Sequence, residues 1–373
     1  MRRPRVKPEH RAYRTADGHV RIGSVVYGIG AEIRDPHGWV WSLVDALDGT
    51  REVGEVVEAV LSEHVALAEE DVCEALVDLL EAGFVEDAAA APPVELSERE
   101  QKRYGRGAAL FRWMDLTPRN SVWDVQMRLR GARVLLIGVG GTGGYAAQAL
   151  VASGVGLLHL VEPDVVELSN LNRQPLFQES DIGRPKADAA LEVLRGKNSD
   201  VRVTGERGHV RGPGDLRARL AADDYSLLVL AADRPDAIRR WTNRACLDAG
   251  VPWVDGGYRG PLVSVGVHVP GRGACWECLR AWEVERRDLR LGPDEDESAA
   301  SPRMPWNPAN AVTAGLSGSL LAHAALALLT GVPALDPGCR LGLNLMVPGE
   351  PMTERFPRRP DCPACGDAPR GHG

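Results

Sequence analysis

The sequence lacks the features that mark several protein classes. It has no surplus of basic residues, since its formal net charge is −8, whereas a general nucleic-acid binder carries a basic surface. It has no N-terminal basic, apolar and small-residue signal pattern, so we expect a cytoplasmic location. Its most apolar stretch, residues 311–329, is interrupted by Thr313, Ser317, Ser319 and His323. That stretch predicts a buried helix rather than a membrane span.

Four of the seven cysteines form two Cys-x-x-Cys pairs, Cys275 with Cys278 and Cys362 with Cys365. Without a secretion signal, a metal site is favoured over disulfide bonds. Four thiolates predict a closed, tetrahedral zinc site that stabilises the fold and pins the C-terminal segment to its domain. Reduced or redox-active pairs are the alternative, but the thioredoxin-like context that such pairs need is not visible.

The first ninety residues predict a small winged-helix-like α+β domain. Residues 19–33 have a hairpin pattern, and three helical patterns follow in residues 40–47, 53–61 and 72–80. Winged helices often bind DNA. Here, however, Arg51 is the only Lys or Arg among fifteen carboxylates between Asp45 and Glu95, and phosphates would repel such a surface. A peptide- or protein-docking module is therefore favoured for residues 1–90.

Residues 88–93 form an Ala/Pro linker, and residues 91–373 predict an α/β domain. Apolar strands are expected at Arg133–Ile137, Leu157–Val161, residues 201–204 and Leu227–Leu230, with a helix from Lys186. Strands that alternate with helices indicate a largely parallel, Rossmann-like sheet.

The first of these strands runs into a glycine loop, residues 138–143. Gly138, Gly140 and Gly143 have the spacing that allows a tight turn and lets backbone amides approach a phosphate at a helix N-terminus. Glu162, nineteen residues after Gly143, can accept a hydrogen bond from a ribose hydroxyl. Taken alone, this pattern is typical of nicotinamide and flavin enzymes.

Polar residues beyond Glu162 favour a triphosphate over a dinucleotide. Arg173 and Lys186 can neutralise the β- and γ-phosphates as pyrophosphate leaves, and Asp233 can hold Mg²⁺. A dinucleotide dehydrogenase has no use for this cluster.

Together these motifs resemble the ThiF/MoeB, or E1-like, superfamily, whose members activate a C-terminal carboxylate as an acyl-adenylate. The resemblance implies an ATP-binding set made of the glycine loop and the polar residues that follow it: Gly138, Gly140, Gly141, Gly143, Glu162, Asp164, Asn170, Arg173, Gln174 and Lys186. It also implies that Arg173, Lys186 and Asp233 are catalytic, and that Arg106 reaches the partner's ATP in a homodimer. The chain departs from the family in having Glu162 where Asp is usual, and Arg-Pro after Asp233.

The family's crossover loop corresponds to residues 283–310, which include the acidic run 294–297. Sulfur-transfer and ubiquitin-conjugating members carry a reactive cysteine there or in an added domain, whereas residues 279–338 contain none. The chain therefore best resembles the peptide-modifying, MccB-like branch, with a PqqD-like module that recognises the leader of ribosomally made, post-translationally modified peptides. The resemblance implies adenylation of a precursor peptide, whose leader would add as a strand near Val25, Val26 and Tyr27. A sulfur-carrier-protein adenylyltransferase and a non-catalytic leader-binding partner of a cyclodehydratase remain as alternatives.

Overall fold

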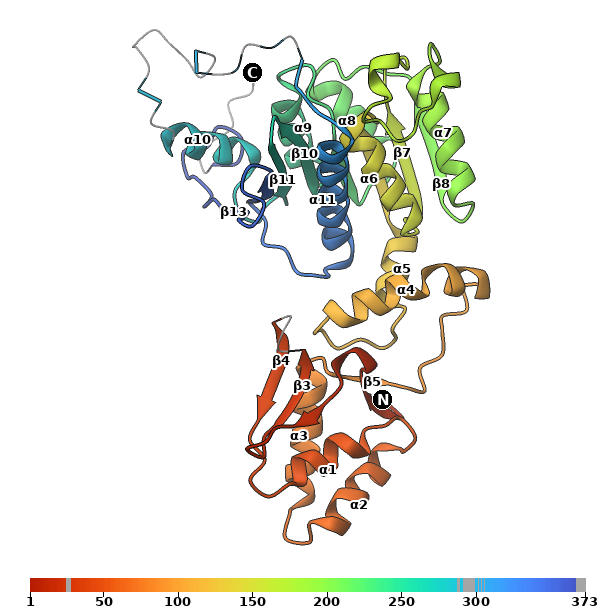
Figure 1. Ribbon diagram of the computed structural model, residues 1–373, viewed down its shortest axis with the longest axis vertical. Helices are drawn as coiled ribbons and strands as arrows, with labels where there is room; N and C mark the ends of the chain where they lie inside the picture. The colour runs from red at the N-terminus through yellow and green to blue at the C-terminus, as the bar shows by residue number, and fades with distance from the viewer. Residues whose placement is uncertain are drawn as a thin grey trace. The chain divides into compact units, whose positions relative to one another are not determined.

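The computed structural model describes residues 1–24, 28–286, 289–290, 299–300, 302, 304 and 306–366. The predicted strand edge at residues 25–27 and the acidic run 294–297 lie outside the described residues. The chain divides into two compact units, Met1–Arg128 and Leu129–Gly373 (Figure 1).

The smaller unit has the predicted α+β content. A three-stranded antiparallel sheet, in the order β2-β3-β4, is followed by three helices. The elements are β2 (Tyr13–Arg14), β3 (Val20–Ser24), β4 (Ile29–Ile33), α1 (Trp39–Ala46), α2 (Val53–Glu63) and α3 (Glu69–Glu81). Val20 and Ile22 of β3 are fully buried in one apolar cluster with Leu43 of α1 and Val56 of α2. The hairpin and helix patterns in the sequence therefore reflect one shared core.

Buried charges attach a further helix to this unit. β1 (Pro4–Val6) pairs with β5 (Val85–Asp87), a short 3-10 turn (Pro8–His10) follows β1, and α4 (Glu98–Met114) and α5 (Asp124–Gly131) come later in the chain. Lys7, which is 4% exposed, donates from Nζ to the carbonyl oxygen of Asp115 over 2.6 Å, and Arg112 of α4 pairs with Glu9 and Glu86. The compact unit extends past residue 90 for this reason, and a separable domain ending at residue 90 stays a prediction.

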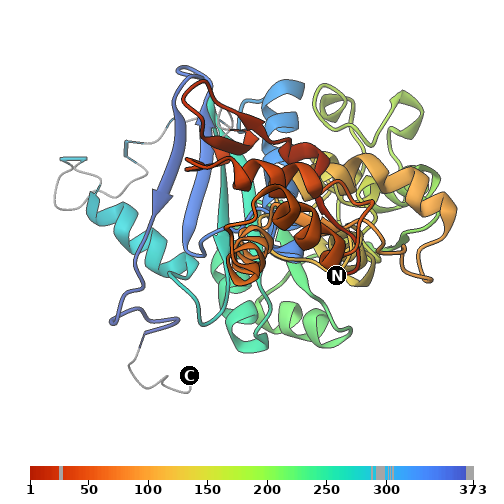
Figure 2. The same ribbon diagram turned by 90° about the horizontal axis from the view of Figure 1, so that it is seen from below.

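The larger unit is built on an eight-stranded sheet in the order β13-β12-β11-β10-β9-β6-β7-β8. Five neighbouring strands are parallel: β6 (Arg133–Ile137), β7 (Leu157–Val161), β8 (Arg202–Glu206), β9 (Leu227–Leu230) and β10 (Trp253–Arg259). Three antiparallel strands extend the sheet to the edge formed by β13 (Figure 2): β11 (Leu262–His268), β12 (Cys339–Asn344) and β13 (Pro351–Arg355). The parallel part matches the predicted α/β fold, and the sequence did not indicate the antiparallel extension.

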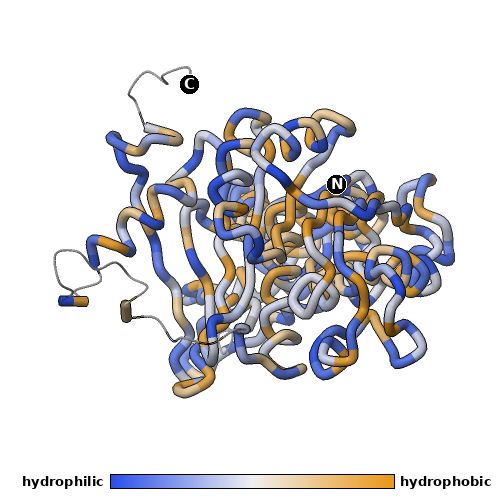
Figure 3. The backbone as a smooth tube through the Cα atoms, turned by 90° about the horizontal axis from the view of Figure 1, so that it is seen from above, coloured by the Kyte–Doolittle hydropathy of each residue, from blue (hydrophilic) through white to orange (hydrophobic). Residues whose placement is uncertain are grey.

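Helices cover this sheet and bury its apolar strands, whose hydrophobic segments gather in the interior (Figure 3). They are α6 (Gly141–Ala152), α7 (Lys186–Lys197), α8 (Pro213–Ala221), α9 (Ile238–Ala249), α10 (Trp276–Arg286) and α11 (Ala311–Thr330). α11 is the apolar helix predicted to be buried. Ten of its residues are buried, and Ser317 bonds Thr142 of α6 at 2.9 Å between hydroxyl oxygens. α11 is thus a core helix, although its length and composition alone would allow a membrane span.

Candidate active site

A cavity of about 1460 Å³ opens in the larger unit at the carboxyl ends of β6, β7 and β9. In open α/β sheets this edge is where ligands bind, because the loops that leave parallel strands converge there. Ten residues from the predicted nucleotide and catalytic sets line it: Gly138, Gly140, Gly141, Glu162, Asp164, Asn170, Arg173, Gln174, Lys186 and Asp233. The tertiary structure therefore brings together residues spread over almost a hundred positions of sequence.

The glycine loop connects β6 to α6 and has steric reasons for its glycines. Gly138 has φ +91°, and an added Cβ would lie 3.1 Å from the backbone of Ala231. A Cβ on Gly143 would clash with the carbonyl oxygen of Gly138, so this residue shapes the turn from inside α6 and is not in the cavity lining. At Gly140 the nearest atom would be Nε2 of Gln174 at 3.6 Å, so protein packing does not demand a glycine there. The open approach at Gly140 suits a phosphate at the N-terminus of α6.

Glu162 follows β7 and is 5% exposed. One carboxylate oxygen accepts from the backbone amide of Val139 at 2.8 Å, and the other accepts from the amide of Asp164 at 3.0 Å. These bonds attach Glu162 to the glycine loop and fix its direction. Each oxygen retains a lone pair for a ribose hydroxyl.

Gln174 and Asn170 lie on the segment that follows, which includes a 3-10 turn at Leu168–Asn170. Asn170 is buried, and its Oδ1 accepts from the amide of Glu167, so its contacts here are within the turn. Gln174 is 6% exposed, and its Oε1 has no hydrogen-bond partner in the described part of the chain. A buried amide oxygen without a partner is costly unless a ligand or water supplies a donor. Gln174 is therefore placed to contact a ligand at the glycine loop.

The predicted phosphate-binding cations approach the same space. Lys186 begins α7 and is 6% exposed, and its Nζ lies 3.1 Å from Oδ2 of the solvent-accessible Asp164. Nη1 of Arg173 donates to the carbonyl oxygen of Ser169 at 2.8 Å and to Oδ1 of Asn172 at 2.9 Å. A pre-positioned lysine and arginine can stabilise the charge of a leaving pyrophosphate without reorganising.

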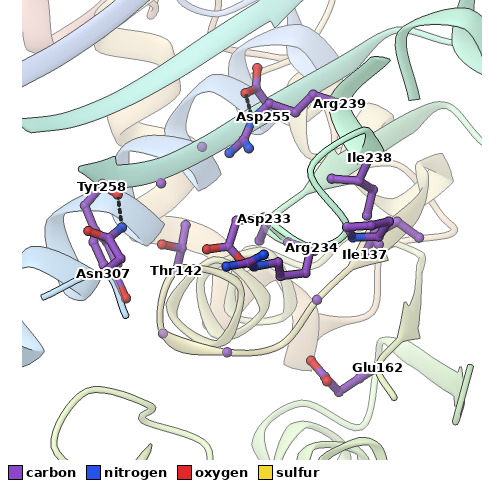
Figure 4. Close-up of a pocket in the computed structure, with 18 of the residues that line it drawn as sticks. Ile137, Thr142, Glu162, Asp233, Arg234, Ile238, Arg239, Asp255, Tyr258 and Asn307 are labelled. Atoms are coloured by element: carbon purple, nitrogen blue, oxygen red, sulfur yellow. Dashed lines mark hydrogen bonds and ion pairs between the residues drawn. The ribbon is translucent and has the colours of Figure 1, made fainter. Parts of the chain in front are cut away.

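Asp233 lies just beyond β9 and is exposed to the cavity. In the view of Figure 4, its carboxylate lies between Glu162 on one side and the Arg239–Asp255 pair on the other. A carboxylate at this position can ligate Mg²⁺, the ion that the sequence predicts there.

The part of the cavity beyond Asp233 holds residues to which the sequence assigned no site role. We call it the arginine half, and it consists of Arg239, Asp255, Arg280, Glu283 and Arg340. Asp255 of β10 accepts from Nε of Arg239 at 2.9 Å and contacts Nε2 of the buried His268 at 3.0 Å. Burial alone raises the pKa of Asp255, but the hydrogen bond with His268 and the charge of Arg239 outweigh it and hold the pKa below its usual value.

Arg340 and Arg280 share the carboxylate of Glu283 on α10, whose side chain is 8% exposed. Arg340 contacts one oxygen and Arg280 the other. Burial lowers the pKa of Arg340, while Asp255 and Glu354 act in the opposite direction. The members of this half come from strands and helices that are far apart in the sequence, so no local sequence pattern predicts that they meet.

The four predicted metal ligands meet in a separate cluster. The sulfur atoms of Cys275, Cys278, Cys362 and Cys365 all lie within 4.8 Å of one another, and neighbouring pairs are 3.4, 3.6 and 3.8 Å apart. Tetrahedral zinc with Zn–S bonds of about 2.3 Å requires S···S separations of roughly 3.8 Å, so the geometry fits a tetrahedral metal. A hydrogen bond with the Cys275 thiol lowers the pKa of Cys278 below its usual value, which favours a thiolate. No open position remains for catalysis in such a site.

Asn243 of α9 supports this cluster from outside. Its Oδ1 accepts from the amide of Trp276 at 3.1 Å, and its Nδ2 approaches Sγ of Cys275 at 3.6 Å. Amide donors to a thiolate stabilise its charge and orient the ligand.

The remaining cysteines have other surroundings. Cys246 and Cys339 are buried, and Cys73 is partly buried against the core of the smaller unit.

Arg106 is exposed on α4 of the smaller unit. The prediction that Arg106 contacts the nucleotide bound to a partner subunit concerns a dimer, and it stays a prediction.

Comparison with known proteins places these features in a family. The model of the ThiF family matches residues 115–364. The SAMP-activating enzyme E1 of Haloferax volcanii is 34% identical over 249 residues, which cover 65% of this chain and 83% of that protein. Ubiquitin-like modifier-activating enzyme 5 of Oryza sativa is 31% identical over 265 residues, which cover 66% of this chain and 59% of the plant protein. The match thus spans about three fifths of that relative's length.

Solved structures extend the likeness to both units. Escherichia coli MccB superimposes with a TM-score of 0.77 at 22% identity, over 99% of this chain and 98% of that chain. MccB, a microcin C7 biosynthetic enzyme, has also been solved with ATP and with N-formylated MccA, and these structures give TM-scores of 0.70 and 0.73. At this identity the likeness shows the fold, and it includes the predicted α+β region before the Rossmann-like domain. Since the family model covers the glycine loop, the cavity and three of the four clustered cysteines, the chain belongs to the ThiF family of adenylyltransferases, as the sequence predicted.

Proposed function

We propose that this protein uses ATP to adenylate the C-terminal carboxylate of a ribosomally made precursor peptide. The observation that carries the proposal is the cavity itself. It begins at a glycine loop with Lys186 and Arg173 and continues past Asp233 into a second, arginine-lined half. A nucleotide bound at the loop leaves that second half for the end of another substrate.

The reaction follows from the positions of these groups. A peptide carboxylate oxygen attacks the α-phosphorus of ATP, the bond to the β-phosphate oxygen breaks, and pyrophosphate leaves. Amides of the glycine loop hold phosphate oxygens, while Lys186 and Arg173 stabilise the leaving charge. Glu162 orients the ribose. In this proposal Asp233 holds Mg²⁺, which supplies charge neutralisation of the triphosphate when bound.

We also propose that the metal in the cysteine cluster is zinc. A set of four cysteine ligands in two knuckles is typical of structural zinc, and thiolate ligands disfavour magnesium or calcium. The metal would anchor α10, which begins at Trp276 between the first two ligands and carries Arg280 and Glu283.

The smaller unit is proposed to bind the leader of the same precursor. In the described residues β4 pairs only with β3, so its other edge is open to strand addition, the mode by which extended peptides join a sheet. Exposed carboxylates on α3, among them Glu70, Asp71 and Glu74, favour a leader with basic residues. Likeness to MccB over nearly the full chain supports a peptide substrate, because a MccB structure holds MccA.

Two other functions fit less well. A sulfur-carrier-protein adenylyltransferase with a persulfide step in the crossover loop would need a cysteine in residues 279–338, and the sequence has none. A non-catalytic leader-binding partner would have no need of Lys186, Arg173 and Asp233, which line one cavity with the glycine loop.

A homodimer with Arg106 at the partner's nucleotide belongs to the same proposal. Mixed dimers of Arg106→Ala and Lys186→Ala chains should recover part of the activity, since one site escapes both changes.

The test of the main proposal is exchange of labelled pyrophosphate into ATP, with the full chain and short precursor peptides encoded beside its gene. Exchange should depend on the peptide and disappear when its C-terminus is amidated. A protein that binds the peptide and ATP but gives no exchange would be a binding partner rather than an enzyme.

A further inference from the structure

The arginine half of the cavity has an ordered polar construction that nucleotide binding does not use. Its floor lacks bulky side chains, because Gly257, Ser264 and Gly266 lie on the cavity side of β10 and β11. Cross-strand register places Asp255 opposite Gly266, and Gly266 opposite Arg340. Residues directly opposite one another share a face of the sheet. This part of the cavity floor therefore has no large side chain, and it lies between the carboxylate of Asp255 and the guanidinium of Arg340.

Arg239 is held in place by a chain of contacts that ends in the core. Its Nε donates to Asp255, whose other carboxylate oxygen contacts His268, and the ring of His268 stacks on the buried Trp253 at 4.3 Å between centroids. A Cβ on Gly266 would lie 2.5 Å from that oxygen of Asp255 and 2.7 Å from Nε2 of His268. The missing side chain at 266 is what lets Asp255 and His268 meet. Asp255 thereby acts as a positioning residue for Arg239.

The charges of this half favour a further anion. Arg239 and Arg340 are 27% and 20% exposed, so both are partly removed from water. Arg239 contacts Asp255, whose carboxylate also contacts His268. Arg340 contacts Glu283, whose carboxylate also pairs with Arg280. Glu354 is also near Arg340, at 3.8 Å, but it is more exposed and lies outside the cavity lining. The contacts with Asp255 and Glu283 use Nε of Arg239 and Nη1 of Arg340, and an arginine has further N–H donors in a planar fork that matches a carboxylate.

A second carboxylate, distinct from the reacting one, is the anion that fits best. The reacting carboxylate has to meet the α-phosphorus near the glycine loop, whereas the Arg239–Asp255 pair lies on the opposite side of Asp233 from Glu162 (Figure 4). A singly charged carboxylate suits a site that also contains Asp255 and Glu283, since these would repel a dianionic phosphate more strongly.

We propose that Arg239 and Arg340 bind the side-chain carboxylate of an Asp or Glu at the C-terminal end of the peptide substrate. This inference rests on the proposed peptide adenylation and specifies its substrate class. The two arginines are specificity-determining residues, and Asp255 and Glu283 hold them in position.

The test compares hexapeptide pools that are randomised at the first five positions and end in Asp, Glu, Asn or Gln. Each pool is captured on the immobilised full-length protein with α,β-methylene-ATP, and bound peptides are counted by mass spectrometry. We expect the acidic pools to be enriched at least tenfold over their amide isosteres. Arg239→Gln and Arg340→Gln should bring that ratio within twofold, and Arg340→Lys should restore part of it. Arg217→Gln, which removes a surface ion pair between α8 and Asp248 at the opposite end of α9 from Arg239, should leave the ratio unchanged.

Several results would overturn the inference: equal capture of all pools, no capture of any pool, or an acid preference that survives both glutamine variants. Acidic pools with an amidated C-terminus test which of the two peptide carboxylates the arginines bind. Loss of the preference for acidic pools after amidation would mean that the arginines bind the α-carboxylate. Melting temperature and ATP affinity establish that each variant is folded. If a glutamine variant does not fold, Arg340→Lys takes its place in the comparison of capture ratios. Pyrophosphate exchange without acid preference would overturn this inference alone. Acid preference without exchange would overturn the proposed enzyme alone.

Discussion

The two halves of the cavity are assembled in different ways. The nucleotide half takes Gly138 to Lys186 from one continuous stretch of chain, in which a strand, a turn and a helix follow in order. The arginine half takes its residues from α9, β10, α10 and β12, which span a hundred positions. Local backbone geometry builds the first half, while sheet register and a helix that begins in the cysteine cluster build the second. Variants should therefore damage the two halves separately.

The largest effect is expected from Lys186→Ala in the nucleotide half. Removing a pre-positioned cation should lower peptide-dependent pyrophosphate exchange by about 100-fold or more for every peptide, acidic or not. Lys197→Ala at the other end of α7, where the side chain contacts Gln148 on the surface, is the matched control. If Lys186→Ala instead changed only the preference among peptides, the division into two halves would be wrong.

Loss of the metal should disturb the arginine half of the cavity more than the nucleotide half. Cys278→Ser removes one of four ligands at the start of α10, and we expect about 3 to 5 kcal/mol lower stability, or roughly a 10 °C lower melting temperature. Elemental analysis should find one zinc per wild-type chain and less in the variant. Affinity for ATP should change little, because the cysteines lie outside the cavity lining. A metal-free native protein of unchanged stability would contradict the zinc proposal.

Asp255→Asn tests the electrostatics of the arginine half. At pH 7 the variant should be less stable by about 2 kcal/mol, because a buried, charge-assisted contact with Arg239 and His268 is weakened. The folded pKa of Asp255 is below its unfolded value, so this stabilisation is complete above the unfolded pKa and is lost as the pH falls through the folded one. The gap in melting temperature between variant and wild type should therefore narrow below about pH 4. A gap that did not depend on pH would point to packing alone.

The last variant tests the steric arrangement at the cavity floor. Gly266→Ala should cost about 1 to 3 kcal/mol, because its methyl group would push Asp255 and His268 apart. Gly257→Ala is the control on the neighbouring strand, where the nearest atom, Nη2 of Arg239, would be at an ordinary 3.8 Å. Thermal melts of the two variants, with acid-to-amide capture ratios, measure the difference. Equal behaviour would show that the contact over Gly266 does not matter.

Sequence alone determined much of the nucleotide half. β6, β7 and β9 were predicted at their observed bounds, since strands buried on both faces appear as continuous apolar runs. The glycine spacing, Glu162 and Lys186 follow from the same local order, and the Cys-x-x-Cys pairs carry their ligand spacing with them. The three helices and the hairpin of the smaller unit were likewise readable from periodicity.

Only the tertiary structure decided the rest. The end of a separable first domain at residue 90 stays a prediction. The buried Lys7 and the ion pairs of Arg112 attach α4 to the smaller unit, and no local pattern predicts a contact between residues 7 and 115. The same holds for Arg239, Asp255, Glu283 and Arg340. Whether these residues meet depends on which strands become neighbours and in what register, because a shift of one residue would turn Asp255 to the other face of the sheet. Pairings between distant segments are decided by the packing of the whole chain, and local sequence does not encode them.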